Sequence, residues 1–341
     1  MSAACLVSLR FADGVEQRVD VAAGHGVLEA ALAAGAPVLN QCRSGSCGSC
    51  MARLVGGDAR MRPGVASSLL PSEQAQGQRL LCLTEAVSDC AFEFAYDSRA
   101  GAGGPAKASA FIDTIERIAP DAVRLKLELA EGDWIDFRPG QFVELTVPGT
   151  DARRRYSMAS SPAALPVIEL LVRLLPGGVM SDYLRDRARV DDVIALTGPY
   201  GGFFLRDKVK APHIMIAGGT GLAPMMSMLD AIRARPGARP NVLLSFGCAT
   251  PEGLFNLDEL DLRSHWMPGL ATRISVDSGA AGAAWRIGNP VAAITADDAR
   301  DPASVAYLCG PPGMVRAARE HLERLGLDPA NIHAEQFVAS E

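Results

Sequence analysis

Three cysteines within nine residues constrain the fold of this chain more than any other feature of its sequence. Cys42, Cys47 and Cys50 have the spacing C-x4-C-x2-C, and Cys82 follows in the strand-like segment 79–84. Four thiolates at this spacing match the pattern that holds a plant-type [2Fe–2S] cluster. The sequence therefore predicts that these four cysteines are iron ligands in an N-terminal domain.

The residues between these cysteines are small. Gly45 and Gly48 permit positive φ, so the loop can wrap around a cluster. Ser44, Ser46 and Ser49 let backbone N–H groups approach the cluster sulfurs as donors. Two other interpretations stay open. One is a zinc site, which usually pairs two C-x2-C segments where this chain has one, and the other is four unrelated buried thiols.

The composition is that of a folded protein of two or three domains, with 341 residues, of which 48% are hydrophobic and 21% charged. The net charge of −6 argues against a nucleic-acid binder and leaves room for docking to a basic patch on a protein partner. The chain has no signal-like leader, and Pro212 and Pro224 would break a membrane helix in the uncharged stretch 211–229. We therefore expect a cytoplasmic monomer that binds neither membranes nor nucleic acid.

A reducing cytoplasm also argues against disulfides in a chain with eight cysteines. Cys5, Cys90 and Cys248 each stand alone in an apolar or strand-like setting. We expect these three to be buried structural thiols.

The first 97 residues are rich in strand-like segments and contain one good helix. Asp13-Gly14 separates two alternating runs, which is typical of a hairpin, and Val27–Ala34 predicts a helix that ends at Gly35. The segment 98–107 is small, polar and rich in glycine, so we expect a flexible linker.

Residues 108–206 contain short strand-like runs separated by Gly, Pro and Asp turns, which predicts a small antiparallel barrel. These runs are 108–117, 123–129, 141–147 and 167–174. Residues 207–341 instead alternate short apolar runs with helical segments, which predicts a parallel sheet with covering helices. The apolar runs are 213–217, 241–246, 271–276 and 304–309, and the last precedes an amphipathic helix at 312–326.

Two motifs in the predicted barrel have chemistry that suits a flavin nucleotide, although taken singly an arginine run is more often a solvated surface and a segment such as Ser181–Leu184 more often just a capped helix. In Arg153–Met158, Arg154 suits a phosphate, Tyr156 a planar ring, and Ser157 a ring nitrogen. Some twenty residues later, Gly177-Gly178 precedes Ser181, which we expect to cap a helix and leave its amides for a pyrophosphate.

A glycine-rich turn in the C-terminal domain suits a dinucleotide. Gly218-Gly219-Thr220-Gly221 follows a predicted strand and precedes a helix, where glycines allow close approach of a phosphate. Pro224 replaces the third glycine of the usual fingerprint. Cys309-Gly310-Pro311 ends a later predicted strand, where Cys309 suits either a cofactor contact or a buried thiol.

These motifs, in this order, resemble those of the ferredoxin–NADP reductase superfamily. With the N-terminal cysteine loop, essentially the whole chain resembles the reductase components of multicomponent aromatic-ring dioxygenases and bacterial monooxygenases, of the benzoate-dioxygenase-reductase type. The resemblance implies a multidomain protein. It would have a β-grasp ferredoxin-like [2Fe–2S] domain at 1–97, an antiparallel β-barrel FAD domain at 108–206 and a Rossmann-like α/β NAD domain at 207–341.

The resemblance also assigns residues. Arg154 would contact the flavin phosphate, Tyr156 would pack on the isoalloxazine, and Ser157 would hydrogen-bond near its N5. Cys309 would lie beside the nicotinamide, so Ser157 and Cys309 are the predicted catalytic pair. The other predicted cofactor-binding residues are Met158, Gly177, Gly178, Val179, Met180, Ser181, Gly218, Gly219, Thr220, Gly221, Pro224, Gly310, Pro311 and Phe337.

Phe337 belongs to an acidic-x-aromatic terminus similar to that of the family. It would either shield the flavin or close a sheet edge. The family usually has a third proline where this chain has Gly313, so the loop shape there is expected to differ.

The resemblance implies FAD, because relatives with an N-terminal ferredoxin domain generally use FAD and those with a C-terminal one use FMN. NADH is predicted over NADPH, since a 2′-phosphate needs nearby cations and Ala249 stands where many relatives have Arg, with Glu252 close by.

Hydride carries two electrons, whereas an oxygenase metal centre takes electrons singly. A flavin holds one or two electrons and an iron–sulfur cluster one, so we expect electrons from NADH to pass through FAD and the cluster to a terminal oxygenase. No general acid or base is required. A reductase for a non-oxygenase partner, such as a deoxysugar-forming enzyme, and a flavin reductase with a mere docking module are the alternatives.

Overall fold

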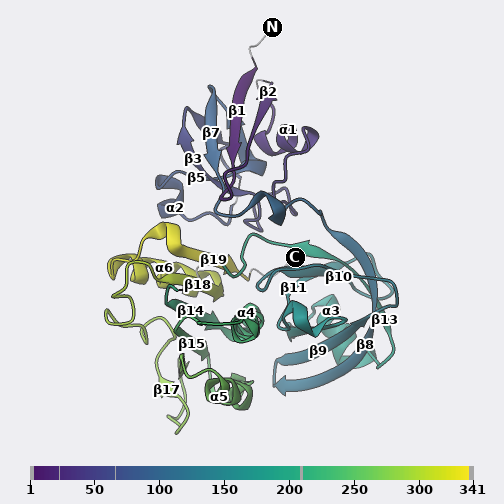
Figure 1. Cartoon of the computed structure of the whole chain (residues 1–341). Coiled ribbons are helices and arrows are strands. Elements are labelled where there is room, and N and C mark those ends of the chain that lie inside the picture. Colours follow the sequence, from purple (N-terminus) through teal and green to yellow (C-terminus); the bar gives the residue numbers. More distant parts are fainter. Residues whose placement is uncertain (1–3, 23, 66, 208–209, 338–341) are drawn as a thin grey trace. The chain divides into compact units, whose positions relative to one another are not determined.

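The computed structural model describes residues 4–22, 24–65, 67–207 and 210–337. The chain divides into two compact units (Figure 1). The first unit comprises residues 1–105 and 200–202, and the second comprises 106–199 and 203–341.

The first unit is built on a mixed five-stranded sheet in the order β2-β1-β7-β3-β5. The strands are β1 (Cys5–Arg10), β2 (Glu16–Val21), β3 (Met51–Gly56), β5 (Gln78–Leu80) and β7 (Cys90–Glu93). β1 pairs antiparallel with β2 and parallel with β7. A small second sheet pairs β4 (Ala59–Met61) with β6 (Thr84–Ala86). This is the β-grasp arrangement expected from the resemblance.

The predicted helix of this unit is α1 (Val27–Ala33), and Gly35 adopts the expected left-handed conformation with φ of 71°. Val27, Leu28 and Ala31 form its buried face. A second short helix, α2 (Pro71–Ala75), was not predicted. It has only five residues, too few to show helical periodicity.

The second unit begins with an antiparallel barrel whose strand order is β11-β10-β13-β8-β9-β12. Its strands are β8 (Ala106–Ala119), β9 (Ala122–Leu129), β10 (Phe142–Thr146), β11 (Arg153–Ser157), β12 (Val167–Arg173) and β13 (Val193–Tyr200). An antiparallel bridge between Met158 and Leu170 joins the two outer strands and closes the sheet. The barrel prediction is confirmed, although β13 was missed and the Arg153 segment, which was not among the predicted strands, forms β11.

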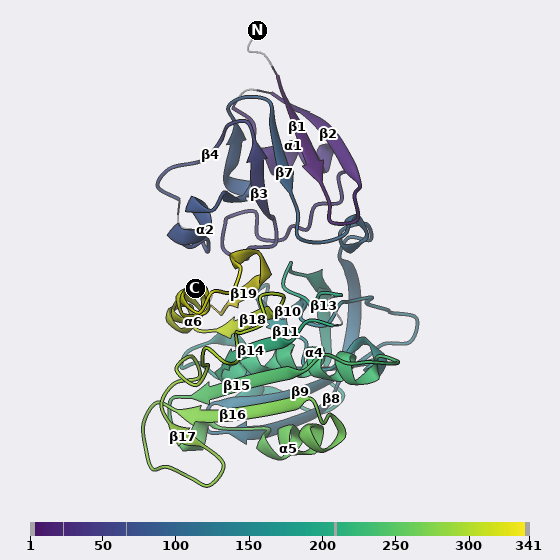
Figure 2. The same ribbon diagram turned by 60° about the vertical axis from the view of Figure 1, so that its left-hand side comes forward.

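The rest of the second unit is a parallel sheet in the order β17-β16-β15-β14-β18-β19 (Figure 2). Its strands are β14 (His213–Gly218), β15 (Val242–Cys248), β16 (Leu270–Val276), β17 (Arg286–Ile287), β18 (Val305–Gly310) and β19 (Ile332–Gln336). The helices are α4 (Leu222–Ala234), α5 (Leu257–Trp266) and α6 (Pro312–Arg324). The predicted α/β architecture is confirmed, but β17 and β19 were not predicted.

Alternate residues of β14 face opposite sides of this sheet. Ile214 and Ile216 pack in one core cluster with α6, whereas Met215 and Ala217 pack in another with α4. The second cluster also contains Leu171 of the barrel, and Figure 1 shows α4 between the barrel and the sheet. The barrel therefore contributes residues to one hydrophobic cluster of the α/β domain and also has a core of its own.

Within the described part of the chain, none of the helices combines the length and the apolar character needed to cross a bilayer.

Candidate functional site

The predicted cluster loop follows α1 and is irregular between residues 36 and 50. Gly45 and Gly48 have φ of 85° and 69°, as expected for a loop that wraps tightly. Backbone N–H groups of Ser44 and Cys47 both donate to the Cys42 Sγ at 3.4 Å. The loop thus already directs amide donors at sulfur, which is how proteins stabilise cluster ligands.

The four cysteines lie in two pairs. Cys42 shares a hydrogen bond with Cys47, and Cys50 shares one with Cys82. The hydrogen bond from Cys47 lowers the pKa of Cys42 to about 3, and that from Cys50 lowers the pKa of Cys82, so in each pair one thiol is shifted toward the thiolate form. Among the described residues, no three Cys, His, Asp or Glu side chains converge as a single metal ion would need. Two dithiol pairs suit the two irons of a [2Fe–2S] cluster better than one tetrahedral zinc ion.

Cys82 does not lie in the strand expected over 79–84. β5 ends at Leu80, and residues 81–83 form a 3₁₀ turn. The Thr84 Oγ1 donates to the Leu80 carbonyl at 2.8 Å, and the Leu81 N–H donates to the Cys50 carbonyl. These local bonds compete with strand pairing and join the Cys82 turn to the cluster loop.

The three arginines of β11 point alternately to opposite faces of the strand. Arg153 and Arg155 both form ion pairs with Glu144 of β10, at 3.5 and 3.6 Å. Arg154 alternates with them and shares the other face with the half-buried Tyr156. Burial raises the pKa of Tyr156, so its ring is neutral. One cation and one aromatic ring are thereby presented together, as a flavin nucleotide would need.

The glycine motif after β12 has a different capping arrangement from the one expected. Gly177 has φ of 69°, and Gly178 is the N-cap of α3 (Val179–Asp182). Ser181 lies inside this turn, and its Oγ accepts from the Leu175 N–H at 2.8 Å. The prediction that Ser181 caps the helix is therefore wrong, because its hydroxyl closes the preceding turn instead.

Two predicted cofactor residues can contribute only backbone atoms. The side chains of Met158 and Met180 lie in the barrel core, with exposed fractions of 0% and 2%.

The dinucleotide turn lies against the end of β18. Gly219 has φ of 54° and begins the 3₁₀ turn Gly219–Gly221, which leads into α4. A Cβ at Gly221 would be 2.3 Å from the Cys309 carbonyl oxygen, so only glycine fits there. Pro224 lies in the first turn of α4, where no intrahelical N–H donor is required. Thr220 is buried in this turn.

Cys309, Gly310 and Pro311 lead from β18 into α6. Cys309 is fully buried, Gly310 has φ of 150°, and Pro311 is the N-cap of α6. The Phe337 N–H donates to the Gly310 carbonyl at 2.9 Å, and its half-buried ring packs against the core that contains Cys309.

The structure brings Ser157 of the barrel to the α/β sheet. Its Oγ donates to the Glu335 Oε2 at 3.0 Å. Glu335 lies on β19 directly opposite Cys309 of β18, and both Ser157 and Cys309 are buried. Burial, and then the Glu335 carboxylate, raise the pKa of Cys309, so its thiol is neutral. Sequence reasoning treated Glu335 only as part of the terminal motif, because the pairing of β19 with β18 is a long-range contact.

Burial raises the pKa of Glu335 to about 7 against the opposing hydrogen bond from Ser157, whereas the ordinary value is 4.5. The unfolded chain therefore loses this proton between pH 4.5 and 7 while the folded chain keeps it, and the stability contributed by the neutral form is lost as pH rises through 7. We expect Glu335→Gln to gain stability over the native protein across this range, by up to about 3 kcal/mol above pH 7. Thermal denaturation from pH 4.5 to 8.5 measures this difference in stability. The control is Glu320→Gln, because Glu320 is exposed. A pH-independent difference would contradict the assignment.

A second residue that sequence reasoning missed lies at the end of β16. The Asp277 N–H donates to the Cys248 carbonyl at 3.1 Å, and the Ser278 N–H donates to the Ala249 carbonyl at 3.0 Å. These bonds place Asp277, which is exposed, beside the segment where cofactor preference was predicted. A carboxylate at the carboxyl end of such strands can accept from a ribose 2′-hydroxyl.

Comparisons with known proteins agree with this arrangement. Three family models match: a 2Fe-2S iron-sulfur cluster binding domain at residues 10–87, an oxidoreductase FAD-binding domain at 109–205 and an oxidoreductase NAD-binding domain at 215–320. The sheets described above therefore form a [2Fe–2S] domain, an FAD domain and an NAD domain, and the cofactor predictions are confirmed.

Several relatives match this chain over nearly their whole length. The toluate 1,2-dioxygenase electron transfer component of Pseudomonas putida is 33% identical, with 98% of each chain covered. The propane 2-monooxygenase reductase component of Mycolicibacterium smegmatis is 33% identical, with 96% of each covered. The crystal structure of the Amycolatopsis cytochrome P450 reductase GcoB has 32% identity and a TM-score of 0.72, covering 98% of this chain and 99% of its own.

The three domains define an oxidoreductase that joins a nicotinamide site, a flavin site and an iron–sulfur site in one chain. The chain belongs to the family of electron-transfer reductase components of aromatic-ring dioxygenases and bacterial monooxygenases.

Proposed function

We propose that this reductase takes hydride from NADH and supplies single electrons to a terminal oxygenase. The observation that carries the proposal is the Ser157–Glu335 hydrogen bond beside Cys309, which joins the FAD domain to the NAD domain in a chain that also holds two dithiol pairs. When bound, FAD exchanges electrons in pairs or singly, and a [2Fe–2S] cluster exchanges them singly.

In this proposal the side chains position cofactors and do not form covalent intermediates. The Glu335 Oε2 accepts a hydrogen bond from the Ser157 hydroxyl and so fixes the direction of that hydroxyl. Arg154 and Tyr156 present a charge and a ring to the flavin nucleotide, and the neutral Cys309 thiol fills the end of β18 without adding charge. Orientation of this kind supplies much of the rate in hydride transfer.

The assignment of an oxygenase partner rests on the names of two relatives, a dioxygenase electron transfer component and a monooxygenase reductase component. The test is electron transfer to purified candidate partners encoded beside the gene, with NADH consumption and oxygenated product measured together. Reduction of an encoded oxygenase supports the proposal. Reduction of a deoxysugar-forming enzyme, with no transfer to an encoded oxygenase, would overturn it.

NADH is the proposed donor because Asp277 and Glu252 follow β16 and β15, at the carboxyl ends of strands where such sheets bind a nucleotide, and carboxylates there disfavour a 2′-phosphate. We expect kcat/KM for NADH to exceed that for NADPH by about tenfold or more, since repulsion between like charges a few ångströms apart costs roughly 1 kcal/mol or more. Asp277→Ser should narrow the ratio mainly by lowering KM for NADPH. Steady-state kinetics of flavin reduction with each donor measure this ratio of kcat/KM values. A native preference for NADPH would refute this assignment.

A further inference from the structure

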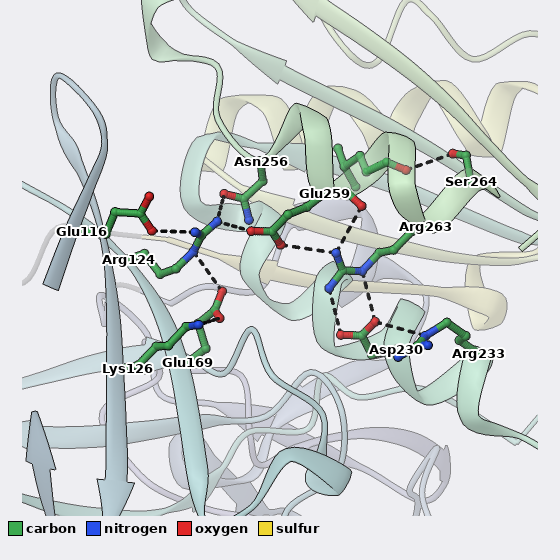
Figure 3. A network of polar contacts seen from close by, with 11 residues as sticks. Glu116, Arg124, Lys126, Glu169, Asp230, Arg233, Asn256, Glu259, Arg263 and Ser264 are labelled. Atoms are coloured by element: carbon green, nitrogen blue, oxygen red, sulfur yellow. Dashed lines mark hydrogen bonds and ion pairs between the residues drawn. The ribbon is translucent and has the colours of Figure 1, made fainter. Parts of the chain in front are cut away.

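Arg124 of β9 reaches from the barrel to α5 of the NAD domain (Figure 3). Within the barrel, its Nη1 donates to the Glu116 Oε2 at 2.7 Å and its Nε lies 3.3 Å from the Glu169 Oε1. Across to the NAD domain, its Nη2 donates to the Asn256 Oδ1 at 2.9 Å and to the Glu259 Oε1. One guanidinium thus contacts four acceptors in two domains.

The network continues from α5 to α4. Arg263 lies 3.3 Å from the Glu259 Oε2 and donates to both carboxylate oxygens of Asp230, at 2.9 and 3.1 Å (Figure 3). Arg233 lies 3.8 Å from the same carboxylate. The barrel, α5 and α4 are therefore connected by an unbroken series of charged contacts.

This network is partly buried. The side chains of Arg124 and Arg263 are only 14% and 16% exposed, and Glu169 and Asp230 are 20% exposed. Burial raises the pKa of Glu169 despite the adjacent Arg124, in keeping with these small exposed fractions. Removing one partner from such a network leaves an uncompensated charge, so the loss of stability exceeds the loss from breaking an exposed ion pair.

The apolar part of this interface includes small and flexible side chains beside larger ones such as Leu171. Ala122 and Ala159 of the barrel share a core cluster with Met225 and Met226 of α4. Alanine presents no shape that interlocks, and methionine adapts to many packings. Directional contacts therefore add orientation: the Arg124 ion pairs place α5 against the barrel, and the Ser227 Oγ of α4 donates to the Ser160 carbonyl at 2.7 Å.

The network is linked to the hydride-transfer site through β12. Arg124 lies opposite Leu171 of β12, and the adjacent Leu170 bridges to Met158, the neighbour of Ser157. The Ser157–Glu335 hydrogen bond joins the same two domains as Arg124 does. Its length depends on how the domains are placed, and a shift of about 1 Å at a reacting centre can cost on the order of 10²-fold in rate.

We infer that Arg124 is a positioning residue for hydride transfer, which fixes the NAD domain against the FAD barrel so that nicotinamide and flavin meet in register. The inference rests on the proposed hydride transfer from NADH but not on the identity of the oxygenase.

The test is stopped-flow reduction of the flavin by NADH in the holoenzyme. Arg124→Gln is expected to lower the limiting rate about tenfold, while the Kd for NADH and the flavin and iron contents stay within twofold of the native protein. Arg124→Lys, which keeps the charge but loses the planar fork, should recover part of the rate. The control is Arg300→Gln, since the Arg300–Asp297 pair is 77% and 81% exposed and should leave the rate unchanged.

A double-mutant cycle separates positioning from a general fault. Glu259→Gln removes the charge that pairs with both Arg124 and Arg263 and leaves the barrel contacts of Arg124 in place, so its effect on the rate should be non-additive with that of Arg124→Gln. If Arg124→Gln fails to hold flavin, Glu259→Gln alone must still slow reduction without weakening NADH binding. A native rate in both variants, or equal losses of rate and affinity, would overturn the inference. Absence of NADH-dependent flavin reduction in the native protein would instead refute the proposed function.

Discussion

Cys82→Ser is expected to abolish single-electron output while leaving reduction of the flavin by NADH intact. Cys82 pairs with Cys50, and its thiolate form is favoured by their hydrogen bond. Iron–sulfur clusters select soft thiolate ligands, and a serine hydroxyl is a poor replacement. One of the two dithiol pairs would therefore be lost.

The measurement is NADH-dependent reduction of cytochrome c, together with iron and acid-labile sulfide content. We expect cytochrome c reduction to fall about 10²-fold or more, since a variant without a cluster has no one-electron carrier beyond the flavin. Flavin reduction by NADH, followed anaerobically, should change by less than twofold. Cys90→Ser is the matched control, because Cys90 is a buried cysteine of the same unit that lies outside the cluster loop. Full cytochrome c reduction by Cys82→Ser would show that electrons leave by another route.

The parts of the fold that local sequence determines were predicted well. Helix α1 and its glycine stop follow from apolar spacing and a single left-handed residue, and β14 follows from a short apolar run before a glycine-rich turn. The missed strand β11 shows the limit of this reasoning. Its sequence reads as a charged surface segment until Glu144 on the neighbouring strand is seen to pair with Arg153 and Arg155.

The candidate site shows a second limit. The glycines and cysteines could be predicted from sequence because the backbone and ligand roles proposed for them impose a spacing that is visible in one segment. Ser157 and Glu335 are 178 residues apart, and no local pattern states that their side chains meet. The same holds for Arg124 and Glu259, 135 residues apart. The prediction that Ser181 caps a helix was wrong for a related reason. Its hydroxyl accepts a hydrogen bond from the Leu175 N–H instead, and the sequence does not show this competing contact.

The second large effect is expected for Ser157→Ala, which should slow reduction of the flavin by NADH about 10²-fold. The variant loses the Oγ that is proposed to hydrogen-bond near the flavin N5 and that donates to Glu335. Because this hydrogen bond lowers the pKa of Glu335, its loss should also move that pKa further above 7. The barrel itself should persist, since alanine fits a strand position and leaves the main-chain pairing of β11 with β10 unchanged.

Stopped-flow reduction over a range of NADH concentrations separates the rate from the affinity. We expect the Kd for NADH to change by less than about threefold, because the hydroxyl contributes one hydrogen bond near the ring and none to the adenosine end. Ser245→Ala is the control, since Ser245 is fully buried and donates to the Pro290 carbonyl at 2.7 Å, away from Ser157 and Cys309 along the chain. That variant should lose about 1 kcal/mol of stability with little change in rate. Equal losses of rate and affinity in Ser157→Ala, or similar slowing in both variants, would point to a structural fault and remove Ser157 from the hydride-transfer site.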